Sequence, residues 1–250
     1  MNDTATSLPG HGLGEGILPW SRDSARADLI QWKQSGLLSA AILYNAGTRI
    51  FEQGTESLDA FLLERGVIAF EREPSTKDRS GIFALCLPGH LFGQVSDSLS
   101  HSSAHSAFAL TRCSVYRIKR ERILSTLQDG GELALFIIRQ YLQNLLRARA
   151  RAAESTIRCA QIRFQQLLQE LAAALEDRNP TGSIRLPLKD KELAGVLGIS
   201  PQQLSVIKRK MEGEKVITCS GGKNRLALRS VSGTLKFFKT HRYKRISSIA

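Results

Sequence analysis

The stretch that decides the fold is LPLKDKELAGVLGISPQQLSVIKRKMEGEKVI, Leu186–Ile217. Its first half predicts a short helix with Leu193, Ala194 and Leu197 on one face, because residues three and four apart lie together on a helix. Ala194 is small enough for another helix to cross closely. Gly198 then supplies the turn that ends the helix.

A second helix is predicted to start at Pro201. Ser200 is the expected N-cap, and Gln203, three residues later, completes a capping box. The apolar residues are expected to point inward: Leu204, Ile207 and Met211. The opposite face is expected to point outward and carries Gln202, Ser205, Val206, Lys208, Arg209 and Lys210. This pattern predicts a helix–turn–helix.

The outward face suits a nucleic acid, because it offers amides and cations with no carboxylate before Glu212. The residues expected to contact base edges are Gln202, Gln203, Ser205 and Val206. Those expected to contact phosphates are Lys208, Arg209 and Lys223. A generic helical hairpin inside a larger core is the competing interpretation, and the exposed cations disfavour it.

Downstream of the helices, Gly221–Gly222 separates two β-like runs and predicts the hairpin of a wing. We therefore expect a winged helix–turn–helix domain over residues 157–235. A basic tail with interleaved aromatic residues follows over residues 236–250.

The positive charge of the chain is concentrated in its second half. The 250 residues carry a formal net charge of +12. Residues 139–250 hold 22 Lys and Arg against 8 Asp and Glu, whereas residues 1–138 hold 13 against 15. This asymmetry predicts a near-neutral sensing or scaffold half joined to a half that binds a polyanion. Charge alone does not separate DNA from an acidic membrane or protein partner.

The first half has the pattern of a β domain. From about Leu38 to Ile118, short apolar segments are separated by turn residues, which predicts a compact antiparallel barrel or sandwich within residues 21–131. The glycines spaced as turns are Gly47, Gly54, Gly66, Gly81, Gly89 and Gly93. Before the β segments we expect a flexible arm over residues 1–20 and a short helix around Ser24–Gln34.

A long helix is predicted over residues 132–156, which contain no Pro or Gly. Its apolar residues recur at three- and four-residue steps and form a narrow stripe: Leu135, Ile138, Leu142 and Leu145. Arg139, Arg147 and Arg151 lie off the stripe. The stripe could pack on the chain's own β domain, but a run of this length more naturally forms the seam of a dimer.

In this order and spacing, the segments resemble the Crp/Fnr superfamily of bacterial transcription regulators over about residues 38–235. The β segment NAGTRIFEQGTESLDAFLLERGVIAFE, the corner LPGHLFGQ and the motifs KELAGVLGIS and MEGEKVI carry the resemblance. It implies an α+β fold with an N-terminal antiparallel β-roll of the cyclic-nucleotide-binding kind, a long dimerisation helix and a C-terminal winged helix–turn–helix. It implies a homodimer that binds an inverted-repeat operator in double-stranded DNA, with RNA polymerase as a candidate partner.

The resemblance also implies an effector pocket, whose charged anchors are missing here. Members that bind cyclic nucleotides have a Glu after the second Gly of the corner and an Arg–Ser or Arg–Thr pair further on. Beside Gly93, these positions hold Gln94 and His105–Ser106. We therefore expect a degenerate pocket, an unknown effector, and no binding of cyclic AMP, whose charge needs an always-charged partner.

Two further departures concern other family members. Oxygen-sensing members use an N-terminal Cys cluster, whereas residues 1–85 contain no Cys, so no iron–sulfur cluster is expected. Many members carry an Arg at the position of Val206 that reads guanine, so the operator is expected to differ. Lys189 replaces the family's helix-capping Thr or Ser, and Asp190 is the expected substitute.

Specific residues disfavour other classes of function. A cupin-like metalloenzyme would need an H-x-H motif, which is absent, and His101 and His105 fall in a Ser-rich loop. We therefore expect no catalytic residue, metal or cofactor. Cys86 and Cys113 are expected to be buried fillers, with a redox pair as the alternative.

The sequence thus predicts a cytoplasmic transcription regulator with no membrane contact, because it shows neither a signal peptide nor a long apolar run. A ligand-binding or protein-interaction module, whose helix–turn–helix does not bind DNA, is the alternative.

Overall fold

The computed structural model describes residues 22–56, 59–73, 81–93, 102–157, 159–175, 183–219 and 225–228. Several sequence predictions lie outside these residues: the arm 1–20, Gln94, His101, the turn Gly221–Gly222, Lys223 and the tail 236–250.

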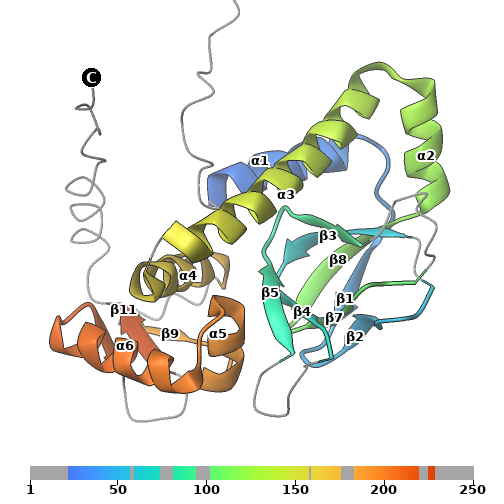
Figure 1. Cartoon of the computed structure of the whole chain (residues 1–250). Coiled ribbons are helices and arrows are strands. Elements are labelled where there is room, and N and C mark those ends of the chain that lie inside the picture. Colours follow the sequence, from blue (N-terminus) through green and yellow to red (C-terminus); the bar gives the residue numbers. More distant parts are fainter. Residues whose placement is uncertain are drawn as a thin grey trace, which may run out of the picture.

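The N-terminal half is a roll of two antiparallel β-sheets (Figure 1). One sheet has the order β1 (Ala41–Tyr44), β8 (Cys113–Ile118), β3 (Ala60–Arg65), β6 (Leu91–Gly93). The other has the order β2 (Arg49–Phe51), β7 (Ser106–Ala109), β4 (Ile68–Glu71), β5 (Ile82–Cys86). Each strand falls on a predicted β segment, so the β prediction is confirmed.

Two of the predicted turn glycines are required by their surroundings. Gly66 joins β3 to β4 at φ +96°, and a Cβ there would lie 2.5 Å from the carbonyl oxygen of Arg112. Gly93 ends β6 at φ +97°, where a Cβ would lie 2.5 Å from the carbonyl oxygen of Asp59. A side chain at either position would strain the backbone and collide with a neighbouring strand.

Three helices pack against the outside of the roll: α1 (Arg22–Gln34), α2 (Arg120–Asp129) and α3 (Gly131–Ile157). Trp32 of α1 is fully buried and meets the ring of Phe136 of α3 edge-on at 4.9 Å between centroids. Gln140 of α3 is also buried, and its Nε2 donates to Asp28 of α1 at 3.1 Å. Helix α2 was not predicted from the sequence.

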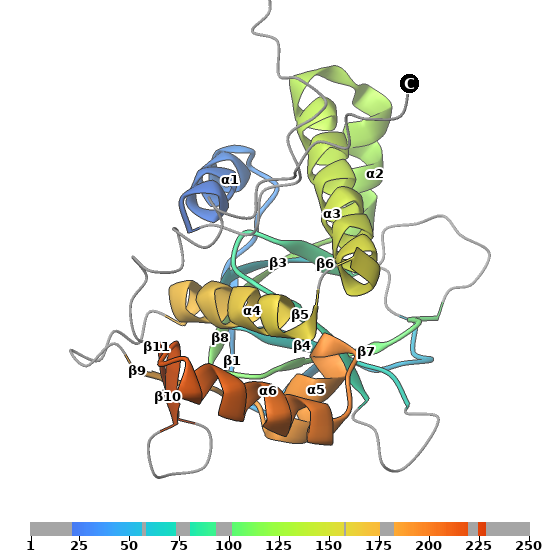
Figure 2. The same cartoon turned by 60° about the vertical axis from the view of Figure 1, so that its left-hand side comes forward.

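The C-terminal part begins with α4 (Ala160–Ala174), which lies across the side of the roll next to α5 (Asp190–Leu197) and α6 (Pro201–Gly213) (Figure 2). A small antiparallel sheet completes it, in the order β10 (Ile217–Cys219), β11 (Arg225–Leu228), β9 (Ser183–Arg185). One hydrophobic cluster contains both Leu85 of the roll and Phe164, Leu193 and Leu197 of these helices. The roll and the C-terminal helices therefore share a core.

Within the described part of the chain, no helix has the length and apolar content needed to span a membrane.

Candidate nucleic-acid interface and interdomain cavity

The turn between α5 and α6 has the predicted chemistry. Gly198 adopts a left-handed conformation at φ 66°, and the next residue, Ile199, donates its N–H to the carbonyl of Ala194 at 3.0 Å. Leu204 and Met211 of α6 are fully buried, as predicted, and Ile207 is partly buried. These contacts fix which face of α6 points to solvent.

The predicted capping box at the start of α6 is confirmed. The Ser200 hydroxyl accepts from the Gln203 N–H at 3.1 Å, and the Gln203 Oε1 accepts from the Ser200 N–H at 3.0 Å. Gln203 is exposed, but its carbonyl oxygen is already used in the cap. Its NH₂ group therefore offers the donors for an external partner.

The outer face of α6 is polar around one apolar residue. Gln202, Ser205 and Arg209 are exposed, and Val206 is 58% exposed. The Ser205 hydroxyl donates to the carbonyl of Pro201 at 3.1 Å, which leaves its oxygen free to accept. The face therefore presents donors, an acceptor and a cation on a rigid helix.

Lys208 departs from its predicted position on the outer face. Its side chain is only 15% exposed, and its ammonium forms an ion pair with Asp190 at the start of α5. Asp190 is therefore a salt-bridge partner and not the expected cap: the N–H of Lys189 donates instead to Glu192 Oε2 at 2.7 Å. A phosphate contact by Lys208 stays a prediction, and it requires this pair to open.

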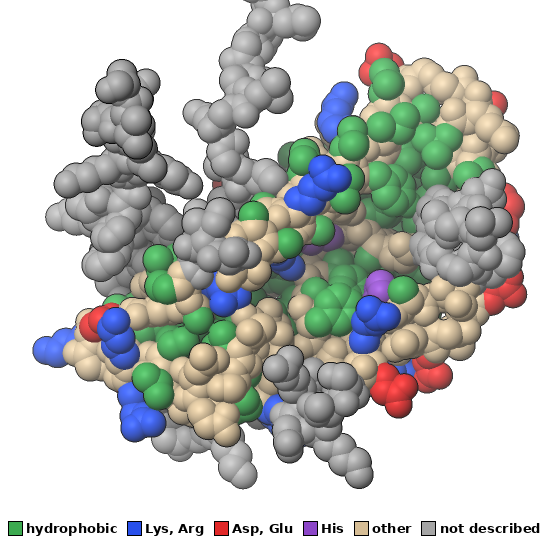
Figure 3. Space-filling view, viewed as in Figure 1, with side chains coloured by type: hydrophobic (Ala, Val, Ile, Leu, Met, Phe, Trp, Pro, Cys, Tyr) green, Lys and Arg blue, Asp and Glu red, His purple; other side chains and the backbone are tan. Residues whose placement is uncertain are grey.

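The apolar stripe of α3 faces away from the roll. Ile137 and Gln140 point to the roll and are buried, whereas the predicted seam is exposed. Its exposed fractions are 54% for Leu135, 46% for Ile138, 53% for Leu142 and 48% for Leu145. Figure 3 shows hydrophobic side chains gathered where α2 and α3 meet. Among the described residues, about half of each stripe side chain stays uncovered, so packing on the chain's own β domain does not bury this face completely.

Aromatic rings surround His105 of the predicted effector pocket. The His105 ring lies edge-on to Phe70, Phe83 and Phe51, with centroids 5.0, 5.7 and 5.8 Å away. Burial and the nearby Arg72 lower the pKa of His105, so the imidazole is neutral near pH 7. Ser106 is buried, and its hydroxyl accepts from the N–H of Gln53 at 2.9 Å. Neither described side chain offers a charge to an anion here.

The two cysteines of the roll are separate, buried thiols. Burial raises the pKa of both Cys86 and Cys113, which keeps them protonated and poorly reactive. Both thiols are buried, as the prediction of core fillers requires. Over the described ranges, no three His, Cys, Asp or Glu side chains gather as metal ligands would.

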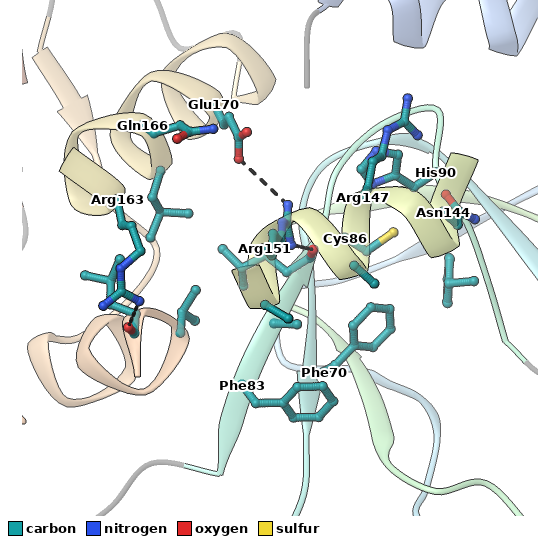
Figure 4. Close-up of a pocket in the computed structure, with 18 of the residues that line it drawn as sticks. Phe70, Phe83, Cys86, His90, Asn144, Arg147, Arg151, Arg163, Gln166 and Glu170 are labelled. Atoms are coloured by element: carbon teal, nitrogen blue, oxygen red, sulfur yellow. Dashed lines mark hydrogen bonds and ion pairs between the residues drawn. The ribbon is translucent and has the colours of Figure 1, made fainter. Parts of the chain in front are cut away.

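A cavity of about 610 Å³ lies between the roll and the C-terminal helices (Figure 4). Its walls come from β4, β5, β6, α3, α4 and α5. Three arginines line it: Arg147 and Arg151 from α3, and Arg163 from α4. The sequence places Arg147 and Arg151 only off the seam. The cavity itself could not be predicted, because the residues that form it are distant in the chain.

The arginines of the cavity have unequal partners. Arg151 pairs with Glu170 at 3.8 Å and donates to the Leu85 carbonyl at 3.4 Å. Arg163 donates to the Leu197 carbonyl at 2.5 Å. Two buried nitrogens of the cavity, Arg147 Nη1 and His90 Nε2, have no hydrogen-bond partner in the described part of the chain. The cavity is therefore electropositive and incompletely satisfied.

Comparison with known proteins connects this architecture to a family. Residues 41–130 match the cyclic nucleotide-binding domain family. No curated protein matches the sequence.

Three solved structures show the same fold. FixK2 from Bradyrhizobium japonicum is 18% identical, with a TM-score of 0.61 over 80% of this chain and 96% of that one. The c-di-GMP responsive global regulator CLP of Xanthomonas campestris is 18% identical, with a TM-score of 0.61 over 82% and 100%. A CRP-family transcriptional regulator from Thermus thermophilus is 18% identical, with a TM-score of 0.63 over 78% and 95%.

Proposed function

We propose that this chain, whose fold is Crp/Fnr-like, is a transcription regulator that binds double-stranded DNA as a homodimer. The observation that carries the proposal is the outer face of α6, which is held in place by buried Leu204. This face exposes Gln202, Ser205, Val206 and Arg209. Amides and a hydroxyl can bond base edges in a major groove, and an exposed arginine can bind a phosphate.

The distribution of charge supports DNA over an acidic protein surface as the partner. Lys and Arg outnumber Asp and Glu by 22 to 8 over residues 139–250, the half that contains α6. A duplex is a long polyanion, so it can use cations spread over many residues, including those around the helix.

The exposed stripe of α3 supports the dimer. Four large apolar side chains, each about half exposed, stand on one face of a 27-residue helix. Two copies of this helix can bury their stripes against each other about a two-fold axis. Such a dimer presents two α6 helices, which is what an inverted-repeat operator requires.

Selection of fragments from a random DNA pool by the purified full-length protein, without added ligand, tests the proposal. We expect recovery of an inverted repeat. The affinity for it should fall steeply with salt, because a dimer of this kind neutralises roughly 6–10 phosphates. Failure to enrich any sequence, or an affinity independent of salt, would favour the alternative of a protein-interaction module.

Two matched charge reversals locate the interface. Arg209→Glu on α6 should weaken binding to the selected DNA about tenfold or more, because it places a carboxylate beside a phosphate in each half-site. Arg112→Glu, at an exposed position of the roll, changes the net charge equally and should have little effect. Equal losses in both variants would show that only the overall charge matters.

A further inference from the structure

The C-terminal half of α3 continues the line of the seam with a cation. The four seam residues recur at steps of three and four, and the next two positions at these steps hold Arg149 and Ala152. Both residues are exposed, like the apolar residues before them. In the described part of the chain, the face that carries the seam therefore stays open to solvent along most of the helix.

Pairing of two copies places both Arg149 side chains together. An inverted-repeat operator needs the two α6 helices at the same end of the dimer, which requires the two α3 helices to run parallel. Figure 1 shows that α3 runs from α2 towards α4, so its C-terminal half lies nearest the C-terminal helices. In a parallel pair, each seam residue faces its own copy on the other helix. Helix axes in such pairs lie roughly 8–10 Å apart, so the two guanidinium groups stay close while they remain at the seam.

The seam offers Arg149 no acceptor. Each seam side chain of a parallel pair enters a hole formed by four residues of the facing helix. For Arg149 these are Leu145, Ala148, Arg149 and Ala152, none of which has a side-chain acceptor. Glu154, the nearest carboxylate along α3, is five residues away, a spacing that does not bring two side chains to one face. Within one chain, no described residue pairs with Arg149 either.

The surroundings of Arg149 leave room for a ligand. Ala148 and Ala152 each carry a single methyl group, whereas the first half of the seam is filled by leucine and isoleucine. A guanidinium presents five N–H donors in a planar fork that matches an oxyanion, so two of them can bind one sulfate or phosphate from opposite sides. Arg147 and Arg151, two residues away on either side, add to the positive potential there.

We propose that Arg149 of two copies forms an anion site shared across the dimer seam, in which one divalent oxyanion binds both guanidinium groups. The site is incomplete in a single chain, because each copy supplies one arginine. Without the anion, the two like charges repel and weaken the dimer at the C-terminal half of α3. With the anion, the same charges hold the two helices together. This inference rests on the homodimer of the proposed function.

Sedimentation velocity on the full-length protein without DNA tests the site. The dimer dissociation constant is measured in chloride and in sulfate at equal ionic strength. In the wild type, sulfate should lower this constant about tenfold, because it forms charge-assisted bidentate hydrogen bonds with both arginines. Sulfate also strengthens apolar burial in general. Arg149→Gln corrects for that effect, because it keeps the apolar part of the seam, and equal gains in the two proteins would overturn the site.

Three substitutions on α3 separate charge from geometry. In chloride at low ionic strength, Arg149→Gln should dimerise about tenfold more tightly than the wild type, because the repulsion is gone. Arg149→Lys keeps the charge without the planar fork, so it should stay as weak as the wild type in chloride and lose most of the gain from sulfate. Arg139→Gln makes the same change at an exposed position off the stripe and should leave both constants nearly unchanged. An Arg149→Gln dimer no tighter than the wild type in chloride would contradict the placement of Arg149 at the seam.

Leu142→Asp distinguishes failure of the site from failure of the dimer. If the wild type and Leu142→Asp are both monomeric at micromolar concentration in either salt, the homodimer is wrong and the shared site with it. If the wild type dimerises, Leu142→Asp does not, and Arg149→Gln matches the wild type in both salts, only the anion site is overturned and the homodimer stands.

Discussion

Replacing Leu142 by Asp in the middle of the α3 stripe should break the dimer without unfolding the chain. In a single chain Leu142 is 53% exposed, so a carboxylate there stays in water. Substitutions at such surface positions usually change the free energy of unfolding by no more than about 0.5 kcal/mol. The cost therefore appears only when two copies associate.

In a two-fold dimer the same position occurs twice at the seam, so both carboxylates lose water together and face each other. Loss of two leucine contacts and burial of two polar groups costs about 4–6 kcal/mol, at roughly 2–3 kcal/mol for each copy. Since about 1.4 kcal/mol is tenfold in an equilibrium constant, the dimer dissociation constant should rise about a thousandfold or more.

Sedimentation velocity over a range of protein concentrations measures this shift. The matched control is Leu43→Asp, which makes the same change on β1 at a side chain that is 64% exposed. We expect the control to stay dimeric where Leu142→Asp is monomeric, with both circular dichroism spectra unchanged. A Leu142→Asp protein that remains dimeric at micromolar concentration would place the seam elsewhere.

Three other substitutions test the buried histidine and the α6 surface. The pKa of His90, lowered to about 3 by burial and then by Arg147 and Arg151, lies below the unfolded value of about 6.5. The unfolded chain therefore takes up the proton first, and stability that is complete above about pH 6.5 falls as the pH drops. Denaturant titrations at about pH 7.5 and pH 5 should show roughly 2 kcal/mol more loss in the wild type than in His90→Gln, and equal losses would contradict the pKa shift. Val206→Arg should shift the selected operator towards guanine at one position in each half-site, and an unchanged motif would show that this residue does not face a base. Asp190→Asn should raise DNA affinity about two- to fivefold by freeing Lys208 from its ion pair, whereas an unchanged affinity would place Lys208 outside the interface.

The parts of the fold that could be predicted are those whose signals are local. Gly66 and Gly93 mark turns because their backbone conformations exclude a side chain. Ser200 and Gln203 fix the start of α6 within a few residues. Helix α2 was missed because its N-cap, Lys119, makes no capping hydrogen bond, so the segment lacks a start signal.

The parts that could not be predicted depend on contacts between distant segments. Lys208 and Asp190 are 18 residues apart. Helical periodicity alone predicts that Lys208 points to solvent, because the way α5 and α6 cross is not visible in the sequence. The cavity combines His90 of the roll with Arg147 of α3 and Arg163 of α4. Helical periodicity indicates only that Arg147 lies outside the apolar stripe of α3. It does not predict which residues of the roll or of α4 pack against that part of the helix.

Leu85 of the roll shares a core with Phe164, Leu193 and Leu197 of the C-terminal helices. The roll therefore cannot be cut from these helices without exposing apolar surface. The cyclic nucleotide-binding domain match ends at residue 130, before any of these helices begins. A fragment cut there would expose part of this core to water, and we expect it to aggregate. The two halves should melt in one cooperative transition. A chimera that joins this roll to the DNA-binding half of another regulator must therefore also transplant the surface of α4 and α5 that packs on β5.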